Sequence, residues 1–170
     1  MPTVVILART TIAAYFDVRW RRVPNWLVVA TIAVSVGWHA VVNGAMGILV
    51  SLAGLALGVC MLFPLYLLRG MGAGDVKFFG ALGAGVTHKH LLMIFILSIL
   101  VSGALALLVV LRKGVLGGTI ARTKDLISGL LRGRLRPHPE ISIDHGTALL
   151  VPFTAAVAIA TWIYVVWRVV

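Results

Sequence analysis

The chain has few acidic residues and a single cysteine. Only five of its 170 residues are Asp or Glu, against fifteen Lys or Arg, so the formal net charge is +10. The lone Cys60 excludes a disulfide framework and a Cys-x-x-Cys zinc site. Charged residues make up 12% of the chain, about half the share of a soluble domain, whereas hydrophobic residues make up 61%. This composition indicates an integral membrane protein.

Several apolar runs reach the length of about 20 residues that spans a bilayer as a helix. We therefore predict an all-α membrane protein, with one membrane-embedded domain over residues 1–170 and about six transmembrane helices. The expected spans are 3–18, 26–42, 46–68, 75–86, 91–111 and 147–167. The fourth is too short to cross alone, so it either continues through the glycine-rich residues before it or crosses half-way.

One long polar segment, 112–146, separates the last two predicted spans. Its central apolar residues share one helical face, which predicts an amphipathic helix on the membrane surface. Most of the Lys and Arg residues fall on the side that holds this segment, so that side is expected to be cytoplasmic. Anionic lipids are the expected partner of these basic residues. Because topology and lipid explain the positive charge, we expect no nucleic-acid partner.

Two of the five acidic residues, Asp17 and Asp75, border long apolar runs. An ionisable group in the bilayer costs roughly 2.5–3.5 kcal/mol at mid-membrane, so both aspartates are candidate functional residues. Each also has a purely structural explanation: Asp75 as a helix N-cap, and Asp17 as an ion-pair partner of the arginines that follow it. The predicted topology places both at the same cytoplasmic boundary. There, two carboxyl groups can share a proton and activate a water molecule.

The histidines suggest a metal site, but their positions argue against one. His88 and His90 lie on one predicted face of the membrane, whereas His138 and His145 lie on the other. Two ligands alone rarely hold zinc. We therefore expect no metal and no other cofactor.

Two motifs surround the aspartates. Gly72-Ala73-Gly74-Asp75 matches the Gly-x-Gly-Asp motif of intramembrane aspartyl proteases, and residues 17–25, DVRWRRVPN, resemble the Asp-x-Arg-x-x-x-[Ile/Val]-Pro-Asn stretch of type IV prepilin peptidases. The chain resembles the short, peptidase-only members of that family, which serve Flp (tight-adherence) pili. It departs from the family pattern before the last span. The family usually has Pro-[Tyr/Phe]-Gly there, whereas residues 143–146 of this chain read IDHG and the proline comes later, at Pro152.

The resemblance implies a function and a set of site residues. Asp17 and Asp75 would be the catalytic pair of an endopeptidase that cleaves the leader of prepilins at the cytoplasmic face of the bacterial inner membrane. Substrate binding is assigned to the motif residues Gly72, Gly74, Pro24 and Asn25. The glycines would leave room for an extended substrate backbone.

Two other classes of function share some of these features. A small ion-coupled transporter also uses intramembrane aspartates and glycine-broken helices, but the internal repeats expected of it are not evident. A non-catalytic assembly component of a pilus or secretion system would tolerate loss of an aspartate, and this chain has both.

Overall fold

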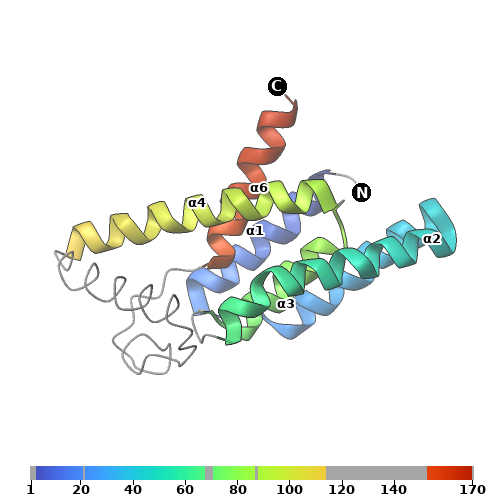
Figure 1. Cartoon of the computed structure of the whole chain (residues 1–170), viewed down its shortest axis with the longest axis horizontal. Coiled ribbons are helices and arrows are strands. Elements are labelled where there is room, and N and C mark those ends of the chain that lie inside the picture. The colour runs from blue at the N-terminus through green and yellow to red at the C-terminus, as the bar shows by residue number, and fades with distance from the viewer. Residues whose placement is uncertain (1–2, 21, 68–70, 87, 114–152, 170) are drawn as a thin grey trace, which may run out of the picture.

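The computed structural model describes residues 3–20, 22–67, 71–86, 88–113 and 153–169. These residues form five helices, which confirms the all-helical prediction (Figure 1). They are α1 (Thr3–Trp20), α2 (Asn25–Leu67), α3 (Ala73–Gly83), α4 (His88–Lys113) and α6 (Phe153–Val169). The predicted amphipathic helix and the first residues of the last predicted span lie outside the described residues.

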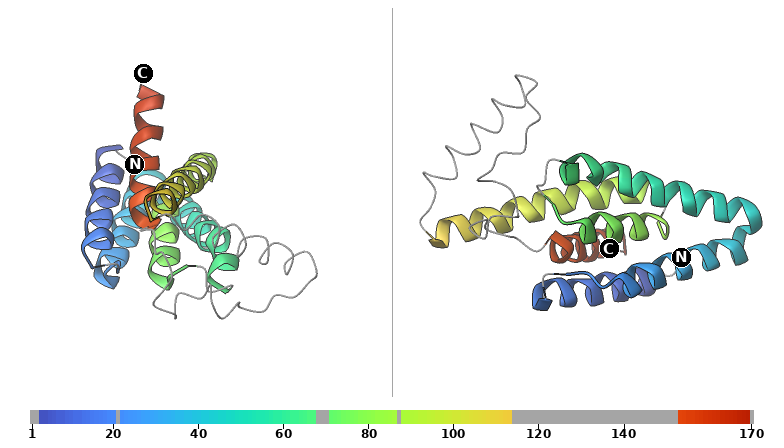
Figure 2. Two further views of the ribbon diagram at one scale, coloured as in Figure 1. Left: turned by 90° about the vertical axis from the view of Figure 1, so that its left-hand side faces the viewer. Right: turned by 90° about the horizontal axis from the view of Figure 1, so that it is seen from below.

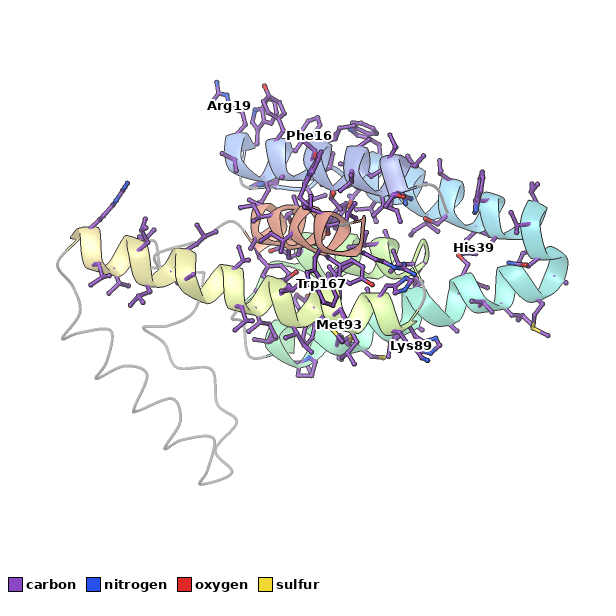
Figure 3. The ribbon with its side chains drawn as sticks, turned by 90° about the horizontal axis from the view of Figure 1, so that it is seen from above. Phe16, Arg19, His39, Lys89, Met93 and Trp167 are labelled. Carbon is purple, nitrogen blue, oxygen red and sulfur yellow. The ribbon has the colours of Figure 1, made fainter. Side chains whose placement is uncertain are left out.

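Helix α2 folds back on itself and provides two of the predicted spans. The turn is at Gly44, whose φ of 59° and ψ of −143° suit glycine and not a residue with a side chain. The two arms approach so closely beyond the turn that a Cβ at Gly47 would collide with the carbonyl oxygen of His39. The chain therefore turns between the second and third predicted spans, and the two arms diverge from the turn like the sides of a V (Figures 2 and 3).

The outer surface of the bundle is apolar. Large side chains point outward along α1, α2 and α4, with Val41 87% exposed and Val4 75% exposed. Helices α2 and α4 are long and apolar enough to cross a membrane, yet only 22% and 17% of their most apolar stretches are buried inside the protein. The core helix of a soluble protein would be mostly buried. An apolar exterior around these two candidate spans is what a lipid environment favours.

Small residues allow α3 to pack tightly against the second arm of α2. A Cβ at Gly58 would lie 2.8 Å from the carbonyl oxygen of Phe79, and Gly54 meets the backbone of Gly83 still more closely. The Ser51 hydroxyl adds a hydrogen bond of 2.7 Å to the carbonyl oxygen of Ala84. The small residues of α3 thus form its contact with α2, as expected for helices that associate in lipid.

Arg9, an unexpected charge within the first predicted span, faces protein. Its side chain is 7% exposed, and its guanidinium donates to the carbonyl oxygen of Thr31 at 3.0 Å and to the hydroxyl of Ser35 at 2.7 Å. A third bond of 3.2 Å reaches the Val5 carbonyl one turn earlier. Arg9 therefore links α1 to the first arm of α2 through polar groups that are shielded from lipid.

The remaining helices bring three chain segments to one end of the molecule. Helix α6 lies between α1 and α4 and packs against both (Figure 3). The end of α1, the start of α3 and the start of α6 all point toward the same end of the bundle, whereas the turn of α2 and the start of α4 lie toward the other (Figures 1 and 2). Arg19 and Lys89 mark these two ends in Figure 3.

Candidate functional site

Asp17 lies in the last turn of α1 and points into the bundle. It is 6% exposed, although the neighbouring Val18, Arg19 and Trp20 are exposed. The guanidinium of Arg19 instead lies over the Trp20 ring, 5.8 Å from its centroid. Burial of a carboxyl group in this position is costly unless it is hydrogen-bonded, so the surroundings of Asp17 matter for the stability of the fold.

Asp75 lies in the first turn of α3 and is partly buried. The helix begins two residues earlier than the sequence predicts, so part of the glycine-rich stretch is helical, and the N-cap residue is Gly72. Asp75 is therefore the third residue of the helix and not its N-cap. A backbone hydrogen bond links its carboxyl group to Gly72, in the manner of a capping box.

Thr154, at the start of α6, joins the two aspartates. Its backbone N–H donates to Oδ2 of Asp17 at 3.0 Å, and its hydroxyl is 2.7 Å from Oδ1 of Asp75. The residue is completely buried. Thr154 thus meets Asp17 and Asp75 at one point, although they are 137 and 79 positions away from it in the sequence. Asp17 also lies near enough for its charge to act on the Asp75 carboxyl group.

The other predicted site residues lie around this point. A Cβ built at Gly74 would lie 3.7 Å from the backbone nitrogen of Val23, so the two sequence motifs are in contact. The carbonyl of Pro24, one residue further, accepts hydrogen bonds from the first turn of α2, and Asn25 begins that helix with an exposed side chain. Gly72 is exposed, and a Cβ there would lie 3.5 Å from Oδ2 of Asp75.

This placement changes the role expected of the two glycines. The room beside Gly74 is already occupied by Val23, whereas the open face of Gly72 adjoins the Asp75 carboxyl group. Of the two, Gly72 is the position at which an added side chain would shield Asp75.

Other polar groups gather at the opposite end of the molecule. A cavity of about 380 Å³ there is lined by His39, His90, Thr161, Tyr164 and Arg168, among others, and by neither aspartate. Within the described ranges there is no group of three or more His, Cys, Asp or Glu residues placed to hold a metal ion. His138 and His145 lie outside those ranges.

Comparison with known families agrees with the geometry. The model of the type IV leader peptidase family matches residues 4–118, which include both aspartates, α1 from its second residue onward, and all of α2 and α3. The chain belongs to the type IV leader peptidase family. This is a family of aspartic peptidases. Searches of curated proteins and of solved structures found no significant match.

Sequence reasoning did not identify Thr154. The residue lies outside the part of the chain that matches the family, and a threonine near the start of an apolar helix is ordinary. The available signal was its place just after Pro152-Phe153, because the first N–H groups of a helix lack partners within it and are free to bind other groups. The groups that bind these N–H donors depend on how α6 packs against α1 and near α3.

Proposed function

We propose that this protein is a prepilin leader peptidase, an aspartyl endopeptidase of the short form that serves Flp-type pili, with Asp17 and Asp75 as its catalytic pair. It would cleave the N-terminal leader of its substrate at the cytoplasmic face of the bacterial inner membrane. No cofactor is required, because the two carboxyl groups supply both the acid and the base.

The observation that carries the proposal is the convergence of both aspartates on Thr154. Their hydrogen bonds of 3.0 and 2.7 Å to a single residue give one site, built from three helices. Each aspartate separately has a structural explanation, but a capping residue and an interfacial ion pair have no reason to meet inside the protein. Membership of an aspartic peptidase family supports the same function independently.

The proposed chemistry uses one protonated and one ionised carboxyl group. The ionised carboxylate removes a proton from a water molecule as its oxygen attacks the scissile carbonyl carbon. The protonated carboxyl group gives its proton to the carbonyl oxygen. Collapse of the tetrahedral intermediate then breaks the C–N bond, and the leaving amine takes up a proton. Water at the membrane boundary is available for the attack, and the bundle holds the two groups in register.

The substrate is expected to reach this site from the membrane. Prepilins of this class resemble a short basic leader followed by a hydrophobic helix, and the apolar exterior of the bundle suits lateral docking of such a helix. The scissile segment would then lie extended beside the exposed face of Gly72. Pro24 and Asn25 remain the proposed contacts on the facing loop.

Purified protein in liposomes, mixed with a prepilin, tests the proposal. Asp17→Asn and Asp75→Asn should each abolish release of the leader, measured by mass spectrometry of the new N-terminus, because each removes one half of the acid–base pair. Expression and helix content should not change.

Asp125→Asn is the matched control, because the sequence assigns Asp125 to the predicted surface segment. This variant should cleave at the normal rate. If both dyad variants released leader at the wild-type rate, Asp17 and Asp75 would not be the catalytic pair. If the wild-type protein released no leader, it would be a non-catalytic assembly component instead.

A further inference from the structure

Thr154 offers chemically different groups to the two aspartates. Asp17 receives the backbone N–H, which only donates hydrogen bonds. The Thr154 hydroxyl binds Asp75. A hydroxyl donates a hydrogen bond to an ionised carboxylate, and it can also rotate to accept one from a protonated carboxyl group. The oxygen Oδ2 of Asp17 is thus fixed as an acceptor, whereas Oδ1 of Asp75 has a satisfied partner with or without a proton.

The position of Thr154 in α6 makes both contacts possible. Because the helix begins at Phe153, the N–H of the next residue has no acceptor within the helix and is free to bind Asp17. The hydroxyl points from the same residue toward α3, where Asp75 lies. Thr154 is completely buried, so its contact with Asp17 is shielded from water, whereas its contact with the partly exposed Asp75 is only partly shielded.

We propose that Thr154 is a positioning residue that assigns the shared proton of the dyad to Asp75. Asp17 then acts as the base that activates water, and Asp75 as the acid that protonates the scissile carbonyl oxygen. After Asp75 has given up its proton, the Thr154 hydroxyl rotates to donate to the new carboxylate. This assignment rests on the proposed function and adds the roles of the two aspartates within it.

Substitution of the hydroxyl alone tests the positioning role. Thr154→Val keeps the shape of the side chain and the backbone N–H that bonds to Asp17, but it removes the hydroxyl that bonds to Asp75. We expect kcat for leader release to fall roughly ten- to hundred-fold, with KM changed less than about two-fold, since a hydrogen bond to a charged group is lost in the reacting state. Thr154→Ser restores the hydroxyl and should restore kcat.

Thr161→Val is the matched control. Thr161 lies two turns further along the same helix and is also completely buried, but its hydroxyl bonds to the Val157 carbonyl and not to the dyad. It should leave kcat unchanged. Equal kcat for Thr154→Val and wild type would overturn the positioning role, as would failure of Thr154→Ser to recover activity.

Infrared spectroscopy of aspartate-labelled protein tests the proton assignment without any substrate. At the pH of maximal activity, wild type should show the C=O stretch of a protonated carboxyl group, and Asp75→Asn should lack it. Persistence of that band in Asp75→Asn would overturn the assignment. If the dyad variants still cleave, the proposed function fails. If they are inactive but Thr154→Val cleaves normally, the inference alone fails.

Discussion

A single methyl group added at Gly58 should test how the packing of helices positions the proposed catalytic pair. A Cβ there would lie 2.8 Å from the carbonyl oxygen of Phe79 and 3.0 Å from Cα of Gly80. Both neighbours are backbone atoms of α3, so neither can turn aside as a flexible side chain would. Gly58→Ala must therefore push α3 away from α2. Asp75 is carried on the first turn of the same short helix and must move with it.

The size of the effect follows from the geometry. An ordinary contact of a Cβ atom needs about 3.4 Å or more, so α3 must move by several tenths of an ångström. Overpacking of this kind costs about 1–3 kcal/mol of stability. A displacement of about 1 Å at a catalytic group lowers rates by roughly a hundred-fold, so we expect a loss of about ten-fold or more in leader cleavage. The loss should exceed what the change in stability explains at the assay temperature.

Gly37→Ala is the control for this prediction. Gly37 lies in the first arm of α2, and a Cβ there would meet nothing within 4 Å. Alanine in its place should raise stability by about 0.5–1 kcal/mol, because glycine in a helix loses more conformational freedom. Thermal unfolding in detergent and leader cleavage in liposomes measure both effects. A Gly58→Ala variant as stable and active as wild type would refute the proposed coupling between helix packing and the dyad.

Three further predictions concern other parts of the molecule. Ser35→Ala should lower stability by about 1–3 kcal/mol, because it removes an acceptor of the buried guanidinium, whereas loss of the exposed Thr11 hydroxyl should cost less than about 0.5 kcal/mol in the same thermal assay. Gly72→Val should slow cleavage at least about ten-fold by covering Asp75, while Gly74→Ala, which makes only ordinary contacts with Val23, should cleave nearly normally. Unimpaired cleavage by Gly72→Val would refute substrate approach at that face. Limited proteolysis should show that the polar segment 112–146 is protected by anionic liposomes and not by zwitterionic ones, because each basic residue near an anionic surface adds about 1 kcal/mol of binding free energy. Equal protection in both lipids would contradict the lipid contact. Neutralising Arg132, Arg134 and Arg136 should weaken that protection in anionic liposomes.

The helical architecture could be predicted from the sequence because hydrophobic length and glycine placement specify it. The apolar runs give the helices, and the turn at Gly44 follows from Asn43-Gly44. The small face of α3 could be predicted because close helix contact in lipid requires small residues. The start of α3 could not, because glycines disfavour helix in isolation and only the capping by Gly72 and packing on α2 compensate.

The candidate site was predictable in part for a similar reason. Asp17 and Asp75 stand out because acidic residues are scarce and costly in apolar surroundings. The environment of Arg9 and the role of Thr154 depend instead on groups that meet only when distant helices pack. The partners of Arg9 on α2 are 22 and 26 residues away in the sequence, and those of Thr154 are 79 and 137 residues away. No local pattern in the sequence encodes those contacts.

The central claim is that Asp17 and Asp75 act together as one catalytic pair. The most direct measurement is single-turnover leader cleavage by Asp17→Asn, Asp75→Asn and the double variant, in the same liposomes. Groups that act together lose their function together, so the double variant should retain the same residual rate as either single variant. Losses that multiply in the double variant, or a single variant that cleaves at the wild-type rate, would contradict a shared catalytic pair.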